Sequence, residues 1–234
     1  MYLYLWYFGV VLKFIVSGRL IIREWLGRLP CFSAFVFICT MKSIFLIPAY
    51  GSALYGSIVQ YLSPWITCLQ VAASVEAFVL FSGWVPRLRR AGFLMMGVCA
   101  IVATGLVKWT TPENKANVAI AATAALERGF GFGIAIFLLL AVCFYRFLDQ
   151  GQPRAAYLHA CCLAFLSVTN AIGWQMIQQG MSLVYPTWVM VLGGVFAFAG
   201  WLLIVKEVPH AWSFSVSRTR IRDTRELDRA VAQR

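Results

Sequence analysis

The sequence has little charge for its length and few of the residues that build catalytic or metal sites. Of 234 residues, 12% are charged, nine are acidic and two are histidine. It contains no GxSxG, HExxH or phosphate-binding P-loop motif, and its acids form no metal-binding cluster. The last apolar run has no lysine for a retinal Schiff base. We therefore expect no catalytic residue, no metal site and no cofactor.

Disulfide bonds are also not expected, although seven cysteines are present. The number is odd, all seven lie in apolar runs, and no CxxC pair occurs. Free cysteine behaves as a small buried hydrophobe. We interpret these thiols as packing residues.

What the sequence does have is an excess of apolar residues, 61% against about 45–50% in soluble domains. They are arranged in runs of about 20 residues, the length that spans hydrocarbon as a helix. This predicts an all-α, polytopic bundle of seven transmembrane helices within residues 1–207, and a basic tail at 208–234. The expected helices are approximately Tyr2–Val16, Cys31–Tyr50, Ser63–Trp84, Ala91–Val107, Glu127–Arg146, Ala155–Gln178 and Thr187–Val205.

Two segments need a separate expectation. The apolar pattern from Val118 to Phe147 is too long for one span, so it either projects beyond the membrane or breaks at Gly129–Gly133. We expect a kink or a change in packing there, with 118–125 outside the hydrocarbon. In the tail, Asp223-x-x-Glu226 resembles a capping box and predicts a short helix.

Most of the positive charge flanks one side of the predicted bundle. Cytoplasmic loops are rich in Lys and Arg, so this asymmetry predicts an outside N-terminus and a cytoplasmic C-terminus. The arginine-rich loops would meet anionic lipid headgroups, which we favour over nucleic acid as the partner of the net charge of +11. The residues concerned are Arg19, Arg23, Arg28, Arg87, Arg89, Arg90, Arg146, Arg154 and the cations from Lys206 onward.

Two charged residues lie deep inside apolar runs, Lys42 and Glu76. An ionised group there costs about 3 kcal/mol or more, so each needs a partner or a wet cavity. Counted from Pro30 and Arg87, both lie about 17 Å from the cytoplasmic side, which makes an ion pair plausible. The pair would fix helix packing, or it would form a proton, ion or ligand site. Lys13, by contrast, is expected near a helix end with its amine reaching outward.

Polar residues also mark the fifth and sixth runs. Glu127 and Arg128 open the fifth as interfacial anchors or as contacts to a polar cavity. In the sixth, Asn170, Trp174 and Gln178 are spaced by four and share one face, and Gln175 adds to its polarity. These side chains would bond neighbouring helices or line an outward-facing cavity.

Two resemblances follow from short motifs. Tyr61-x-x-Pro64-Trp65 and Tyr185-Pro186-x-Trp188 open two runs, and with the 3+1+3 plan they are similar to small sugar-transporting seven-helix families; the Pro-Gln motif of those families is missing. RLIIREWLGRLPCF and LERGFGFG resemble an uncharacterised group of bacterial seven-helix membrane proteins. The second resemblance implies the bacterial inner membrane and brings no function.

These observations favour a sensing or accessory subunit that acts through partner proteins, or as a homo-oligomer, and not an enzyme. The alternative is a small secondary transporter with a polar site among the second, third and sixth runs. A polar cavity through the bundle would favour the transporter. A sealed core with an exposed apolar groove would favour the accessory subunit.

Overall fold

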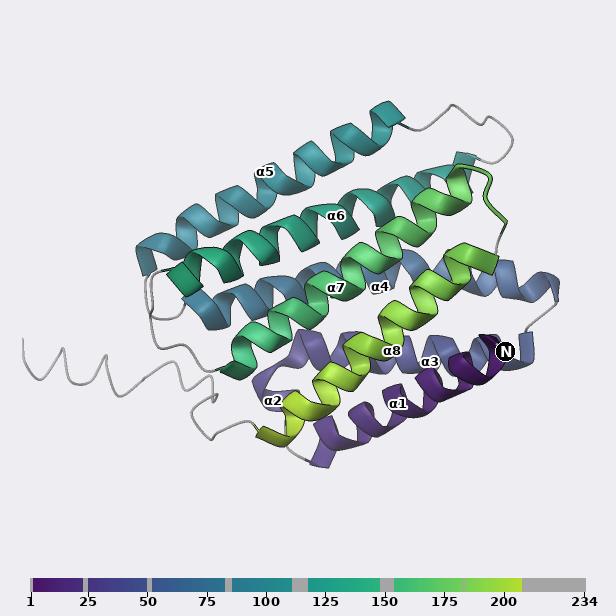
Figure 1. Ribbon diagram of the computed structural model, residues 1–234, viewed down its shortest axis with the longest axis horizontal. Coiled ribbons are helices and arrows are strands. Elements are labelled where there is room, and N and C mark those ends of the chain that lie inside the picture. Colours follow the sequence, from purple (N-terminus) through teal and green to yellow (C-terminus); the bar gives the residue numbers. More distant parts are fainter. Residues whose placement is uncertain are drawn as a thin grey trace, which may run out of the picture.

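The computed structural model describes residues 2–22, 25–49, 52–82, 86–110, 118–147, 154–182 and 184–207. All regular structure in this part of the chain is helical, and the long helices run side by side in an elongated bundle (Figure 1). They are α1 (Tyr2–Ile22), α2 (Trp25–Arg28), α3 (Pro30–Ala49), α4 (Ala53–Ser82), α5 (Pro86–Thr110), α6 (Val118–Phe147), α7 (Arg154–Gln178) and α8 (Val184–Glu207).

Six of the described helices are long and apolar enough to cross a membrane, so this is a multi-pass membrane protein. They are α1, α3, α4, α6, α7 and α8. In helix α5 the apolar stretch within the described side chains is Gly92–Gly105. Large apolar side chains on the outer faces are exposed, as a lipid-facing surface requires, among them Leu203 (67%) and Phe196 (63%).

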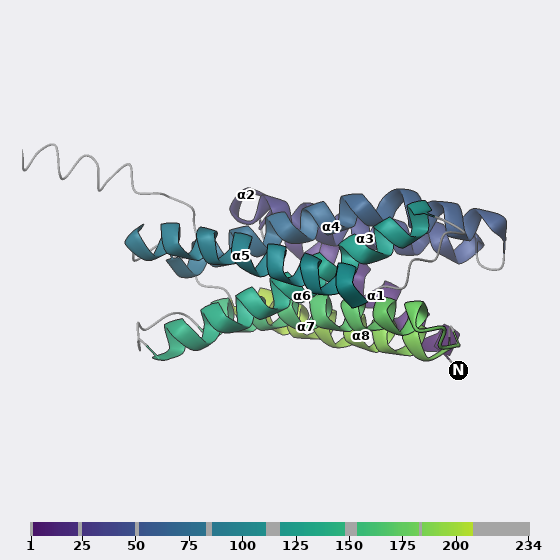
Figure 2. The ribbon, with the colours of Figure 1, turned by 90° about the horizontal axis from the view of Figure 1, so that it is seen from above.

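The helices pack as a ring with one helix outside it. Helix α1 contacts α3, α3 contacts α4, and contacts continue through α6, α7 and α8 back to α1. Helix α4 also contacts α7 across the ring, while α5 packs mainly against α6 (Figures 1 and 2). We call the end at which α1 begins the N-terminal end of the bundle. Helix α3 ends there, and the α7–α8 turn lies there too (Figure 1).

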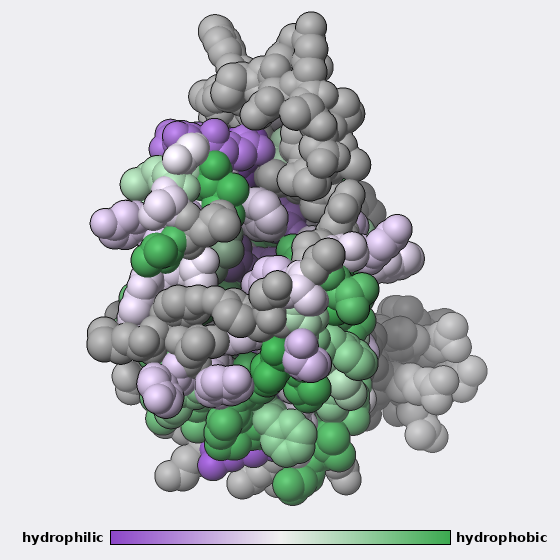
Figure 3. Space-filling view, turned by 90° about the vertical axis from the view of Figure 1, so that its right-hand side faces the viewer, coloured by the Kyte–Doolittle hydropathy of each residue, from purple (hydrophilic) through white to green (hydrophobic). Residues whose placement is uncertain are grey.

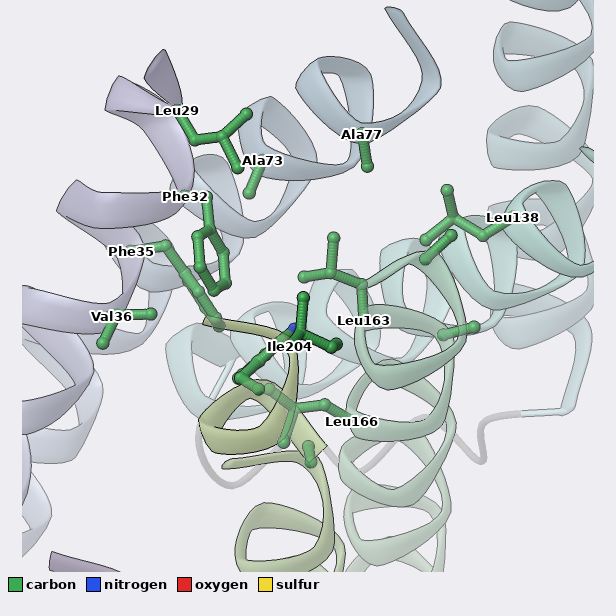
Figure 4. Close-up of a cluster of buried hydrophobic side chains, with 14 of the residues drawn as sticks. Leu29, Phe32, Phe35, Val36, Ala73, Ala77, Leu138, Leu163, Leu166 and Ile204 are labelled. Carbon is green, nitrogen blue, oxygen red and sulfur yellow. The ribbon is translucent and has the colours of Figure 1, made fainter. Parts of the chain in front are cut away.

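The half of the bundle away from the N-terminal end is filled mostly by apolar and aromatic side chains, with the buried His159 ring packed against Phe32. Trp201 is 1% exposed, and its ring centroid lies 4.9 Å from that of Phe32 and 5.0 Å from that of Phe198. Figure 4 shows part of this core, in which Phe32, Phe35, Ala73, Leu163, Leu166 and Ile204 converge from α3, α4, α7 and α8. We call this region the sealed core.

Small residues let several helices approach closely. A Cβ added at Gly193 would clash with the Thr169 side chain, so α8 packs tightly on α7 there. On α6, Gly129 and Gly133 face the backbone of α5, whereas Gly131 faces α7. The α7–α8 turn is closed by Gly180, whose φ of 74° suits a helix C-terminus.

Several predicted bounds are confirmed and others are wrong. Helices α3 and α7 begin and end within one residue of the prediction. Helix α4 begins at Ala53, so Tyr55 to Ser57, predicted as a loop, are helical; the one glycine in this stretch, Gly56, costs only about 1 kcal/mol in a helix and does not end it. Helix α6 is uninterrupted, with its candidate span at Ala125–Phe144. The tail and its capping box lie outside the described residues.

Candidate functional site

A polar pocket lies inside the ring, between its middle and the N-terminal end. Its volume is about 200 Å3, it is partly open, and residues from α1, α3, α4, α7 and α8 line it. Seen from the N-terminal end, hydrophilic residues lie recessed between apolar ones (Figure 3). The polar lining consists of Lys13, Lys42, Ser43 and Asn170. We call this site the lysine pocket.

Lys13 points into the bundle, so the expectation that it reaches outward is wrong. Helix α1 continues to Ile22, which places Lys13 at the centre of the candidate span Tyr4–Ile22. Its Nζ donates a hydrogen bond of 2.7 Å to the Ser43 hydroxyl, and it lies 5.6 Å from the centroid of the Phe198 ring. A lysine so deep in a membrane needs polar or π partners, and these two supply them.

Lys42 is joined to Glu127 through a serine. The Lys42 Nζ donates to the Ser63 hydroxyl oxygen at 3.2 Å. The Glu127 carboxylate accepts hydrogen bonds from the Ser63 hydroxyl and the Trp174 indole, and it attracts the Lys42 ammonium group. Glu127, from α6, does not line the lysine pocket itself but reaches it through Ser63 and Lys42.

The structure does not bring Lys42 and Glu76 together. The Glu76 carboxylate instead accepts from the backbone N–H groups of Phe32 (2.8 Å) and Cys31 (3.3 Å), the first turn of α3. Eleven residues separate Cys31 from Lys42, about 16 Å along the helix. The predicted pairing took Pro30 and Arg87 to lie at one level, whereas Pro30 lies near the level of Glu76.

The polar face predicted on α7 lies beside the pocket. Asn170 lines it, and Trp174 bonds Glu127. Gln175 accepts a 2.6 Å hydrogen bond from the fully buried Arg128 guanidinium. The Gln178 side-chain oxygen is buried with no hydrogen-bond partner in the described part of the chain.

Sequence reasoning missed three residues of the site, Lys13, Ser43 and Ser63. The sequence did carry a signal for Lys13. The apolar pattern of the first run continues past Val16, and a helix that followed this pattern to its end would have placed Lys13 at its centre. The serines carry no such signal, because small hydroxyl residues are common in membrane helices as packing elements.

A second hollow differs in character from the lysine pocket. This apolar groove, about 450 Å3, lies between α6, α7 and α8 and is lined by Leu139, Leu158, Cys161, Cys162, Ala164, Phe165, Val168, Phe196 and Ala197. It offers no charged group. No cluster of three or more metal-ligating side chains occurs among the described residues.

The charges of the lysine pocket suit it to anions. Glu76 and Glu127 are the only acids whose side chains the structure describes, and Glu76 is engaged at the start of α3. Lys42 therefore has the Glu127 carboxylate as a neighbour, whereas Lys13 has no acidic neighbour among the described side chains. The chain matches no protein-family model, no curated protein and no solved structure, so no relative supplies a function for this arrangement.

Proposed function

We propose that the protein is a membrane sensor that binds a small anion in the lysine pocket and passes the signal to partner proteins or to further copies of itself. The observation that carries this proposal is that Lys13 and Lys42 reach one pocket with Glu127 as their single acidic neighbour among the described side chains. A cation without a counter-charge is unfavourable in a low-dielectric site. A bound anion removes that imbalance.

Sensing is favoured over conduction by the sealed core. On the side away from the N-terminal end, Phe32, Phe198 and Trp201 pack against one another and leave the pocket closed. A ligand that enters from one end and cannot pass through changes the packing around it, which is what a sensor requires. The exposed apolar groove on α6–α8 gives a partner helix a surface to contact.

The proposal includes the topology expected from the charges. Helix α5 is the span that, added to the six candidate spans, makes seven. Its close packing on Gly129 and Gly133 of α6 supports this. The N-terminus is outside, the pocket is reached from outside, and the arginine-rich loops meet anionic headgroups on the cytoplasmic side of the bacterial inner membrane.

Cysteine labelling tests this topology. In a background without native thiols, an impermeant reagent added outside should label cysteines at Ser57, Asn114 and Gly180, and should not label those at Gly27, Arg89 and Gln152. Labelling of Arg89→Cys from outside would exclude the seven-span arrangement.

One observation favours the transporter as the second candidate. Lys13 lies at the centre of its candidate span, and secondary transporters bind their substrates near the bilayer midplane. Both candidates need the same anion site. They differ in whether the sealed core opens.

Binding and uptake measurements test the proposal. Purified protein in nanodiscs should bind small carboxylates in calorimetry, and Lys13→Met should weaken binding about tenfold or more, since a charge-assisted hydrogen bond contributes about 1.5–3 kcal/mol. Arg19→Met is the matched control, because Arg19 lies on the same helix and donates to the Leu202 carbonyl instead. Unchanged binding in Lys13→Met would overturn the proposal. Saturable uptake into proteoliposomes would select the transporter over the sensor.

A further inference from the structure

The charge at the lysine pocket sums to one excess positive charge. Lys13 and Lys42 line it, and Glu127 is linked to Lys42 through Ser63. Neither Glu127 nor Arg128 lines the pocket itself; Glu127 is counted because its carboxylate attracts the Lys42 ammonium group, whereas the Arg128 guanidinium donates to Gln175 on α7. From these charges we infer that the ligand is a monovalent anion with an apolar body, and that Glu127 determines this valence. The inference rests on the anion binding proposed above.

Charge balance discriminates between ligands because the site is inside the bundle. At a given distance, two unit charges attract each other about four times more strongly at an effective dielectric constant of 20 than in water. A monovalent anion makes the pocket neutral. A neutral ligand leaves Lys13 without a counter-charge, and a divalent anion leaves one negative charge beside the Glu127 carboxylate. Both are disfavoured relative to the monovalent anion.

The lining of the pocket indicates where the charged head and the apolar body of the ligand would bind. The Lys13 ammonium group and the Ser43 hydroxyl already form a hydrogen-bonded pair, and Asn170 adds an amide. The rest of the lining is mostly apolar, including Phe35, Leu46, Ile66, Met190, Val191 and Phe198. One charged head would therefore bind the lysines, and an apolar body would pack on α3 and α8.

The volume of the pocket limits the size of the ligand. A cavity of about 150 Å3 accommodates benzene, a molecule with six carbon atoms. The lysine pocket, at about 200 Å3, therefore suits a compact monocarboxylate of about eight non-hydrogen atoms. The carboxylate head could belong to a soluble acid or to a fatty acid in the membrane. The pocket would recognise the same carboxylate group in either case.

Three ligands with equal numbers of non-hydrogen atoms test the inference, namely hexanoate, succinate at a pH where it is divalent, and neutral hexanamide. Calorimetry in nanodiscs of zwitterionic lipid should show hexanoate binding at least about tenfold tighter than succinate or hexanamide, equivalent to about 1.4 kcal/mol. This comparison uses the wild-type protein alone, so it does not depend on how any variant folds.

Two variants change the charge count in opposite directions. Glu127→Gln keeps hydrogen-bonding groups for Ser63 and Trp174 and leaves two excess positive charges, so succinate should gain affinity and overtake hexanoate. Lys13→Met leaves no excess positive charge, so the affinity for hexanamide should equal or exceed that for hexanoate. Thermal unfolding without ligand shows that each variant is folded.

The outcomes separate this inference from the proposed function. If hexanoate and succinate bind equally well in both the wild type and Glu127→Gln, the valence rule is overturned while anion binding stands. If neither carboxylate binds the wild type, both fail. If only long-chain acids added to the nanodiscs bind, the source of the head is the membrane. A fatty acid that then binds more tightly than the dicarboxylic acid of equal length supports the valence rule, and equal binding overturns it.

Discussion

The two acids described inside the bundle, Glu76 and Glu127, lie in similar apolar helices yet have different partners. Glu76 is 8% exposed and accepts hydrogen bonds from two backbone N–H groups at the start of α3, where a helix has unsatisfied donors and a partial positive charge. Glu127 meets a serine, a tryptophan and a lysine next to an open pocket. The first arrangement is complete without a ligand. The second leaves a positive charge in excess, so the partners of a membrane acid indicate its role better than its depth does.

The same contrast separates the sealed core from the lysine pocket, and the largest expected effect is on the core. Trp201→Ala removes the ring that packs on Phe32, Phe35 and Phe198. We expect a loss of about 3 kcal/mol in the free energy of unfolding. The measurement is unfolding by titration with a denaturing detergent. Leu203→Ala on the exposed face of the same helix is the control and should have little effect. A Trp201 variant as stable as that control would contradict a packed core.

The next effect concerns the cap that Glu76 provides. Glu76→Ala should lower the free energy of unfolding by about 2 kcal/mol, because hydrogen bonds to charged groups contribute about 1.5–3 kcal/mol and the N–H groups would be left unpaired in the membrane. Glu76→Gln, which keeps one acceptor oxygen, should recover part of the loss. The same detergent titration measures both. An alanine variant as stable as the wild type would mean that the cap contributes nothing.

The smallest effect is the coupling of Lys42 to each acid. A double-mutant cycle with Lys42→Met and Glu127→Gln should give a coupling energy of about 1 kcal/mol, since the two share Ser63. The parallel cycle with Lys42→Met and Glu76→Gln should be additive, because those side chains do not meet. Thermal unfolding of all variants in one detergent measures both cycles. Equal coupling energies in the two cycles would contradict the conclusion that Lys42 interacts with Glu127 and not with Glu76.

Much of the fold, and part of the site, could be predicted from the sequence. The bounds of α3 and α7 follow from apolar runs that end at proline or polar turns, and the spacing of Asn170, Trp174 and Gln178 predicted a polar face on α7. The partner of Lys42 could not be predicted, because it depends on the register of α3 against α4 and on α6, which is distant in the sequence. Depth counted from helix ends fails when one helix extends beyond its neighbour, as α4 does beyond Pro30.

Helix α5 has a consequence for how the protein is made. Its main neighbour is α6, whose Gly129 and Gly133 admit its backbone, and it packs little on the rest of the ring. During synthesis α5 leaves the ribosome before that neighbour exists. Helix α5 therefore gains its packing only after α6 has been translated, so the two helices join the bundle as a hairpin.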